Sequence, residues 1–404
     1  MTIPDRYGIH IDQARRIASP ILWLISDKNS AEPSPEEWQA LGGQLNQGDP
    51  YADAVSEWLA ANPGNWRLIE TALQKPVGES YQDLPDAVCQ FFSHTQSEPD
   101  WLDKEAINRG CDVVARSGQT GMKVLRDFGL MAGYQASAIN QTLVKTGALE
   151  KGAQRRVAET TKWWMDCTER GGILPGGEGF RTTLRVRLIH AMVRRQLSLR
   201  PDWDHEYLGL PVNQLDMQVT YLAFSVMFLI GQRVLGVPLS RQEADDVMHL
   251  WRYIGWLMGL DESLLASSEQ AGRVALYRNL LSQALADETS CQLAKALMNE
   301  PLERHYPAFQ WLRSHWDRQV HLSILRLFIG SQGMRALGLP QCTLPWYPLV
   351  FAPVNYTTQT LIRLLPGGKG WLARRGRRAQ WSMLRILFGP SEPGITRVAE
   401  PSKS

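Results

Sequence analysis

Two arginines and a histidine share one face of a predicted helix in residues 187–194. Arg187, His190 and Arg194 are spaced at i, i+3 and i+7, which places all three on one side of an α-helix. The residues between them are mostly apolar, and a helix that is apolar around most of its circumference is usually buried. Two buried guanidinium groups are strongly destabilising unless anions meet them. We therefore expect an anionic group against this face.

Two kinds of group could supply the expected anion. A haem would supply it, because an imidazole can ligate the iron through one ring nitrogen while the arginines pair with the propionates. The alternative is a core histidine with two ordinary ion pairs to Asp or Glu on a neighbouring helix. Structural ion pairs are commoner than cofactor sites, so the spacing alone favours the alternative. Both explanations stay open.

A second polar stripe precedes this helix. Arg156, Glu159 and Thr160 recur at helical spacing, followed by Trp163 and Trp164. Arg156 and Glu159 could form an i, i+3 surface pair worth a few tenths of a kcal/mol. In the functional interpretation, this polar cluster beside two tryptophans forms a distal pocket that faces bound dioxygen. That interpretation depends on the haem assignment of His190.

The elements that would carry these residues are predicted to be helices. Helix starts are indicated by capping boxes at Ser34–Glu37 and Ser240–Glu243 and by the serines at 267–268. Apolar residues follow at steps of three and four, whereas alternating strand patterns with Asn-Gly or Asp-Gly turns are absent. The apolar stretch 219–230 is shorter than a bilayer span requires, and its length predicts a buried core helix. We predict an all-α protein with one large domain.

Composition excludes several classes of function. The chain has 404 residues and a formal net charge of +2, which gives no electrostatic argument for a nucleic-acid partner. Sequence motifs of the form HExxH, GxSxG, GxxxxGK[ST] and GxGxxG are absent. The five cysteines form no CxxC pair, and the first residues lack an apolar signal region. We expect reduced cysteines and a cytoplasmic location, at most peripheral to a membrane.

At the two polar stripes the sequence resembles the rubber oxygenase family, which includes the latex clearing proteins and the MpaB-type oxygenase of mycophenolic acid biosynthesis. The matching blocks are Arg156-x-x-Glu159-Thr160 and Arg187-x-x-His190-x-x-x-Arg194. Further similarity lies in residues 48–54 and 249–255, and the resemblance spans roughly 49–340. The combined pattern is more specific than any single block.

The resemblance implies an all-α fold with a globin-like core around one haem b, and an activity in which dioxygen oxidises or cleaves an apolar substrate. It implies that His190 is the proximal iron ligand, with Arg187 and Arg194 orienting it or pairing the propionates. Arg156 and Thr160 would belong to the distal side. Glu159 stands where the latex clearing proteins have a distal lysine, and it could take over the role of a base.

One further departure from the family is Asn140, which stands where a pocket glutamate is expected. An amide does not titrate, so Asn140 cannot act as a general base. These departures leave haem binding plausible and put polyisoprene cleavage in doubt.

The resemblance also sets the expected domain boundaries. We place an N-terminal helical extension at 1–110, an oxygenase-like catalytic core at 111–340, C-terminal helices at 341–389 and a mobile tail at 390–404. Residues 368–389 form a basic amphipathic helix with tryptophans, which could lie on an anionic membrane surface. A face packed on the domain explains the same pattern equally well.

The leading functional hypothesis is a cytoplasmic, haem b-dependent oxygenase that acts with dioxygen on a hydrophobic, unsaturated lipid or isoprenoid. A non-catalytic haem-binding or sensor protein of the same fold is the alternative. A third option is a membrane-peripheral helical scaffold without a cofactor. Loss of haem binding and oxygen consumption on substitution of His190 would separate the first two from the third.

Overall fold

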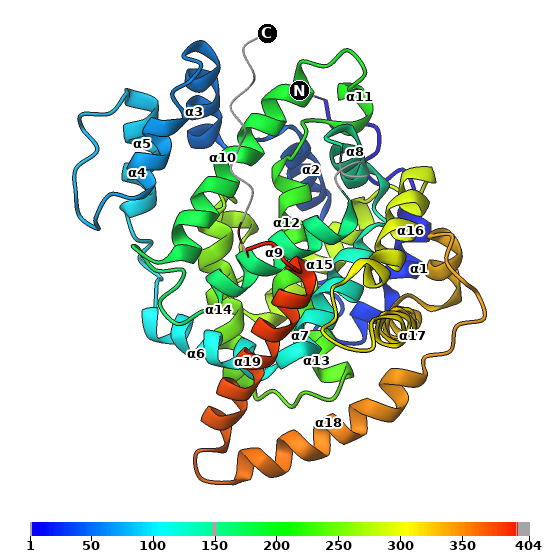
Figure 1. Ribbon diagram of the computed structural model, residues 1–404. Coiled ribbons are helices and arrows are strands. Elements are labelled where there is room, and N and C mark those ends of the chain that lie inside the picture. The colour runs from blue at the N-terminus through cyan, green and yellow to red at the C-terminus, as the bar shows by residue number, and fades with distance from the viewer. Residues whose placement is uncertain (1, 148–151, 393, 395–404) are drawn as a thin grey trace.

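The computed structural model describes residues 2–147, 152–392 and 394, and within these ranges all regular elements are helices (Figure 1). The prediction of an all-α protein with one large helical domain is confirmed. The long helices are α1 (Ile11–Leu22), α2 (Pro35–Gly43), α3 (Pro50–Ala61), α4 (Trp66–Leu73), α5 (Asp86–Gln96), α6 (Lys104–Arg116), α7 (Gly118–Val124), α8 (Ser137–Lys145), α9 (Ala153–Cys167), α10 (Glu178–Ser198), α12 (Gln214–Leu222), α13 (Phe228–Val234), α14 (Arg241–Leu257), α15 (Glu269–Ser282), α16 (Glu288–Glu303), α17 (Gln310–Ala336), α18 (Trp346–Leu364) and α19 (Gly368–Phe388).

Shorter elements join these helices. They are η1 (Gln44–Asn46), α11 (His205–Leu208), η4 (Glu262–Leu264) and two π-helical segments, η2 (Leu125–Met131) and η3 (Ala223–Met227). The π-helical segments lie inside longer helical runs, between α7 and α8 and between α12 and α13. Such widened turns are frequent at functional sites, and both segments border the cavity described below.

Helix starts follow the local sequence signals. The predicted capping boxes at Ser34 and Ser240 are both present, with the serine hydroxyl accepting from the backbone N–H three residues on. Ser268 caps α15 by accepting from the N–H of Ala271. Helix α14 ends at Leu257, and Gly259 follows with a φ of +89°. That backbone conformation suits glycine because a side chain would be strained there.

The apolar stretch in the middle of the chain is a core element. Helices α12 and α13 with η3 form one helical run over 214–234, which by length and composition would suit a membrane span. It is the one such helix among the residues described, and 61% of its apolar window is buried inside the domain. The predicted core helix is therefore confirmed by burial. The argument from length was wrong, because the helix extends beyond 219–230 at both ends.

Helix α19 packs against the domain rather than presenting an apolar face. It crosses α6, α7 and α9, and Leu372, Leu384 and Leu387 are buried in these contacts. Arg377 donates to the carbonyl oxygen of Thr168. Apart from Trp371, the exposed positions of this helix are basic, polar or glycine. Of the two explanations for the pattern of 368–389, the structure shows packing of the apolar face on the domain, and membrane contact of this segment stays a prediction.

The N-terminal helices are joined to elements far along the chain. Helix α1 packs on α15, and α3 packs on α10 and α5. The boundaries at 110 and 340 stay predictions. Most of the predicted mobile tail, 390–404, lies outside the described residues.

Glycine allows α19 to approach the end of α6 closely. A Cβ on Gly376 would lie 2.0 Å from the carbonyl oxygen of Ala115, whereas a Cβ on Gly370 would meet only the flexible end of Arg374 at 3.4 Å. We expect Gly376→Ala to lower the free energy of unfolding by about 1–3 kcal/mol, because backbone must move apart. Gly370→Ala, on the same helix, should raise it by up to about 1 kcal/mol. Urea denaturation monitored by circular dichroism measures both, and equal midpoints for the two variants would contradict this account.

Candidate functional site

A cavity of about 1160 Å³ lies inside the helical domain. Its wall is built from α1, α7, α8, α9, α12, α15, α17 and α19, from both π-helical segments, and from one position of α16. Most of the lining side chains are apolar, including the stacked rings of Phe128 and Phe328 with centroids 4.2 Å apart. The volume exceeds the roughly 300–1,000 Å³ of typical small-molecule pockets. The cavity can therefore hold a large hydrophobic molecule.

Helix α9 brings two of the predicted site residues to this cavity. Arg156, Thr160 and Trp164 border it at helical spacing. Arg156 lies beside Tyr134, where burial raises the pKa of the phenol and the nearby guanidinium lowers it by a smaller amount. The buried Nε1 of Trp164 has no hydrogen-bond partner among the described residues. This part of the wall offers a cation, a hydroxyl and an unpaired N–H to a ligand.

Glu159 lies on the same helix but is not among the residues that border the cavity. Its Oε1 accepts from Arg155 Nε at 2.7 Å, so the i, i+4 pair with Arg155 replaces the i, i+3 pair with Arg156 considered from the sequence. Asn140, by contrast, borders the cavity and donates to the carbonyl oxygen of Tyr134 and to Ser290 Oγ. The structure therefore does not bring Glu159 together with Arg156 and Thr160.

His190 lies on α10 and is half-buried, but it is not among the residues that border the cavity. Its Nδ1 is fully buried and has no hydrogen-bond partner within the described residues. Burial and, to a smaller extent, the charge of Arg194 lower the pKa of the imidazole to about 4. The ring is therefore neutral at pH 7, which is the form that can ligate a metal.

The two arginines beside His190 are met by protein carboxylates. Arg187 pairs with Asp49 through two hydrogen bonds of 2.6 and 2.8 Å, and it also donates to the carbonyl oxygen of Leu257. Arg194 Nη1 lies 3.2 Å from Asp53 Oδ1, yet its Nε and Nη1 lack a geometrically acceptable hydrogen bond. For Arg187 the structure shows the ordinary ion pair considered as the alternative above. Arg194 keeps buried donors for a further acceptor.

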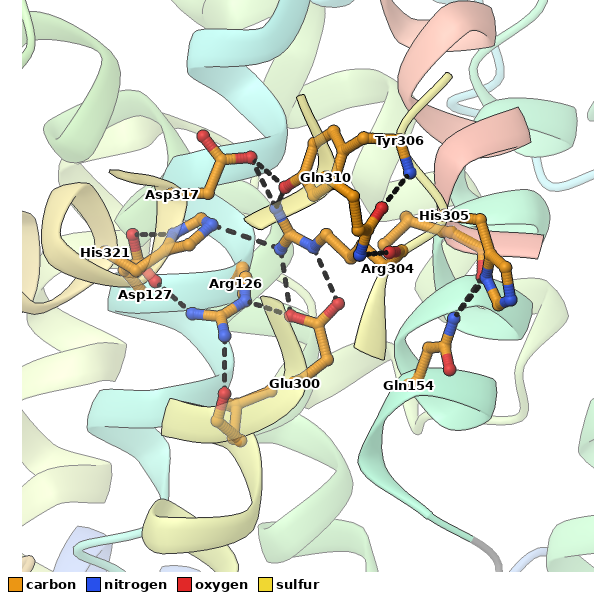
Figure 2. A network of polar contacts seen from close by, with 12 residues as sticks. Arg126, Asp127, Gln154, Glu300, Arg304, His305, Tyr306, Gln310, Asp317 and His321 are labelled. Carbon is orange, nitrogen blue, oxygen red and sulfur yellow. Dashed lines mark hydrogen bonds and ion pairs between the residues drawn. The ribbon is translucent and has the colours of Figure 1, made fainter. Parts of the chain in front are cut away.

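A second set of polar side chains borders the cavity and extends behind its wall (Figure 2). We call it the buried network, and its members are Arg126, Asp127, Glu300, Arg304, Tyr306, Asp317 and His321. Glu300 stands at its centre: its Oε2 accepts from Arg126 Nε at 3.0 Å and from Arg304 Nη2 at 2.8 Å, and its Oε1 accepts from Arg304 Nε at 2.8 Å. These bonds join η2 to α16 and to the residue that follows α16.

The hydrogen bonds of the buried network settle the tautomer of His321. Arg304 Nη2 lies 3.1 Å from His321 Nε2, and a guanidinium can only donate, so Nε2 accepts. The proton therefore sits on Nδ1, which donates to Asp127 Oδ2 at 2.8 Å. Burial lowers the pKa of His321 well below its usual value and raises the pKa of Asp127 to about 7. His321 is thus a neutral side chain in the cavity wall.

The sequence offered no signal for the buried network. Asp127 and His321 are 194 positions apart, and neither stands in a motif that predicts the other. The partners of Arg187 and Arg194 were closer to prediction, since Asp49 and Asp53 lie within residues 48–54, a block that carries part of the family resemblance. Which arginine each aspartate meets depends on the packing of α3 against α10.

Removing the central carboxylate of the buried network should be strongly destabilising. We expect Glu300→Gln to lower the free energy of unfolding by about 3–5 kcal/mol, because two buried guanidinium groups lose their shared anion. Glu303→Gln, an exposed position on the same helix, is the matched control and should change it by less than about 0.5 kcal/mol. Thermal and urea denaturation of both variants measure the difference. Comparable stability of the two would show that the network contributes little.

Comparisons with known proteins were made for the sequence and for the fold. The family model for the catalytic domain of the "ER-bound oxygenase mpaB/B'/Rubber oxygenase" family matches residues 122–356. The rubber oxygenase of Streptomyces sp. (strain K30) is 26% identical over 207 residues, which cover 50% of this chain and 50% of that protein. The chain thus aligns with about half the length of this curated relative.

The fold is similar to a solved structure of latex clearing protein in its closed state. The TM-score is 0.66 at 20% sequence identity, and the superposition covers 89% of this chain and 95% of that one. At this identity the likeness establishes the shared helical architecture. The matched family segment, 122–356, contains the wall residues of α9 and the whole of α10.

Proposed function

We propose, because the chain belongs to the ER-bound oxygenase mpaB/B'/rubber oxygenase family, that it is a haem b-dependent oxygenase acting with dioxygen on a hydrophobic, unsaturated lipid or isoprenoid. The observation that carries the proposal is the large, mostly apolar cavity whose wall includes Arg156 and Thr160. Apolar lining with a few polar groups is typical of a site that binds and orients a hydrophobic molecule. The rubber oxygenase relative supports an unsaturated chain as the substrate class.

The unpaired donor atoms of His190 and Arg194 suit a haem, and both residues lie outside the set that borders the cavity. A haem iron needs a single strong protein ligand, and the buried, unpaired imidazole of His190 can provide it. Among the described residues no group of three or more His, Cys, Asp and Glu side chains is arranged to hold a metal ion without such a cofactor. When bound, the haem would supply the iron at which dioxygen is activated. We assign His190 as the proximal ligand.

The neighbouring arginines have different roles in this proposal. Arg194 has unpaired buried donors, which suit a propionate. Arg187 is fully engaged by Asp49 and by a carbonyl oxygen, so it acts as a positioning residue that fixes α10 against α3. A Cβ on Gly259 would lie 2.2 Å from Asp49 Oδ2, which shows how tightly this ion pair is enclosed.

On the cavity side, Arg156, Thr160 and Trp164 would orient the substrate and meet negative charge as it develops. A guanidinium, a hydroxyl and an indole N–H all donate hydrogen bonds, and the buried position of Trp164 strengthens the one that its N–H can make. Glu159 does not stand on this wall, so the geometry gives no support to its role as a base, and we propose no step for it.

A non-catalytic haem-binding or sensor protein of the same fold is the second candidate. The specific observation that favours it is that Asp317, the one carboxylate among the described residues that border the cavity, is already held by Arg304 and Tyr306. Glu159 is paired with Arg155, and Asn140 cannot take up a proton at neutral pH. Such a protein would bind haem and show no oxygen consumption.

The cytoplasmic location stays a proposal. All five cysteines are free in the structure, which fits a reducing compartment.

The proposed function is tested by absorption spectroscopy and an oxygen electrode. We expect protein expressed with haem supply to show a Soret band. The band should be lost in His190→Ala and retained in His205→Ala, which changes an exposed histidine outside the site. Oxygen uptake with squalene should fall by roughly 10²-fold in Thr160→Val, whose Soret band is unchanged. A Soret band without oxygen uptake would favour the sensor, and no Soret band would refute haem dependence.

A further inference from the structure

One cation on the cavity wall has no partner. Lys123 of α7 borders the cavity, and among the described residues its ammonium group makes no hydrogen bond and no ion pair within 4 Å. Its nearest recorded contact is the ring of Tyr347, whose centroid lies 5.7 Å from Nζ. Burial lowers the pKa of this amine, and the charge of Asp317 raises it by a smaller amount. An enclosed ammonium without an anion is unfavourable, so an anionic partner would stabilise it.

The nearby carboxylates are already engaged. In the buried network Glu300 is shared by two arginines, and Asp127 accepts from Arg126 and His321. Asp317 accepts from Arg304 Nη1 at 3.1 Å and from the hydroxyl of Tyr306. Within the network two arginines face three carboxylates, and Lys123 brings the number of cations to three. Among the charged groups of the buried network and Lys123, the ammonium group is therefore the one without a hydrogen-bond partner in the described residues.

The surroundings of Lys123 indicate what kind of anion fits. Met122, Leu130, Leu297 and the stacked pair Phe128–Phe328 border the same cavity and offer no polar atoms to a ligand apart from backbone groups. The one ammonium group of Lys123 can compensate one negative charge, so it suits a monoanionic group at this end of the cavity. An apolar chain that ends in one carboxylate satisfies both requirements.

We propose that the cavity binds a long-chain carboxylic acid, with its carboxylate paired to Lys123 and its apolar chain along the phenylalanine-lined wall. The proposal names the substrate class of the oxygenase site, and it rests on the proposed function only for the statement that the bound acid is oxidised. Binding itself requires neither haem nor turnover. Arg156 and Thr160 border the same cavity, so a chain anchored at Lys123 shares this space with the polar part of the α9 wall.

The test compares an acid with its uncharged ester. By isothermal titration calorimetry of the full-length protein, we expect linoleic acid to bind at least about tenfold more tightly than methyl linoleate. Lys123→Met, which keeps the length and most of the volume of the side chain, should abolish this preference and leave the affinity for the ester unchanged. Lys295→Met, an exposed position on α16, is the control and should keep the preference.

A second readout separates anchoring from a structural role. Without ligand, Lys123→Met should unfold at the same or a higher temperature than the unmodified chain, because an unpaired buried charge is removed. Equal affinity for acid and ester, or a preference that survives in Lys123→Met, would overturn the proposal. A preference for the acid without a Soret band or oxygen uptake would refute the proposed function and leave this site standing.

An independent observation concerns the outer surface of α18. This helix runs along the outside of the domain, apart from most of the other helices (Figure 1), and Pro348 is its one buried residue. Leu349, Leu361 and Leu364 are 67%, 60% and 77% exposed. Trp316 of α17 packs on Trp346 with ring centroids 5.1 Å apart, and this contact extends the surface to the exposed start of α17. The additional exposed apolar residues are Phe309, Trp311, Leu312, Val350 and Val354.

The charge of the same region is one-sided. Residues 318–391 contain no Asp or Glu and ten Lys or Arg, whereas the whole chain is nearly balanced. Three of these cations, Arg363, Lys369 and Arg377, pair with Glu243 or Glu169. Arg374 and Arg375, at the start of α19 just beyond α18, are exposed. An exposed apolar helix flanked by cations complements an anionic lipid surface, into which the apolar side chains insert while the cations meet headgroups. A protein partner would need no such one-sided charge.

We infer that α18 and the start of α17 dock on the surface of an anionic membrane. Vesicle co-sedimentation tests this, with phosphatidylcholine alone and with 30% phosphatidylglycerol as probes, and we expect binding to the mixed vesicles. Combined substitution of Leu349→Asp and Leu361→Asp should reduce bound protein by at least about tenfold. Leu199→Asp, a 69% exposed leucine at the end of α10, should leave it unchanged.

Size-exclusion chromatography of the same variants tests whether a second copy of the chain, instead of a membrane, covers this surface. If the unmodified chain elutes as a dimer that the two α18 substitutions dissociate, the surface joins two copies of the chain and the membrane proposal is overturned. Equal sedimentation of the doubly substituted and unmodified chains would overturn it as well.

Discussion

The stability of the domain depends on pairing most of its strongly buried charges with opposite ones. In a helical interior the backbone satisfies its own hydrogen bonds, so the polar side chains carry the long-range polar contacts. Arg126, Glu300 and Arg304 are almost completely buried, and together they join segments that are more than 170 positions apart. Replacing any one of them leaves an uncompensated charge, which is worse than having none of the three. The buried network therefore fixes how η2 lies against α16.

The same constraint organises the surroundings of His190. Asp49 both caps α3 and holds Arg187, so the start of one helix is tied to the middle of another. Glycines at 48 and 259 allow this approach, since a Cβ at either position would overlap the paired side chains. His190 lies between two arginines that are held from the α3 side, and its own buried Nδ1 has no hydrogen-bond partner among the described residues. An unpaired imidazole in so tightly paired a region is the feature that packing alone does not explain.

Local signals in the sequence predicted local structure well. The capping boxes at Ser34 and Ser240 are formed by neighbouring residues, so they could be read directly. The burial of Arg187 and Arg194 could also be predicted, because the pattern of a single helix determines it. What covers a helix face depends on distant residues. The amphipathic pattern of α19 is the same whether a membrane or α6 covers it, and the pattern therefore could not identify the covering surface. The hydrogen bond between Asp127 and His321 could not be predicted from the sequence either, because the two residues are 194 positions apart.

The size of the cavity gives a final argument about ligand binding. A space of about 1160 Å³ lined largely by apolar side chains would forfeit many packing contacts if it stayed empty. The space is therefore filled, by solvent in part and by a ligand when one is available. Water gains few hydrogen bonds along the wall formed by Phe128 and Phe328, whereas an apolar chain gains contacts there. The free energy of filling this volume thus favours a hydrophobic occupant, and the isolated ammonium group of Lys123 favours one that carries a single negative charge.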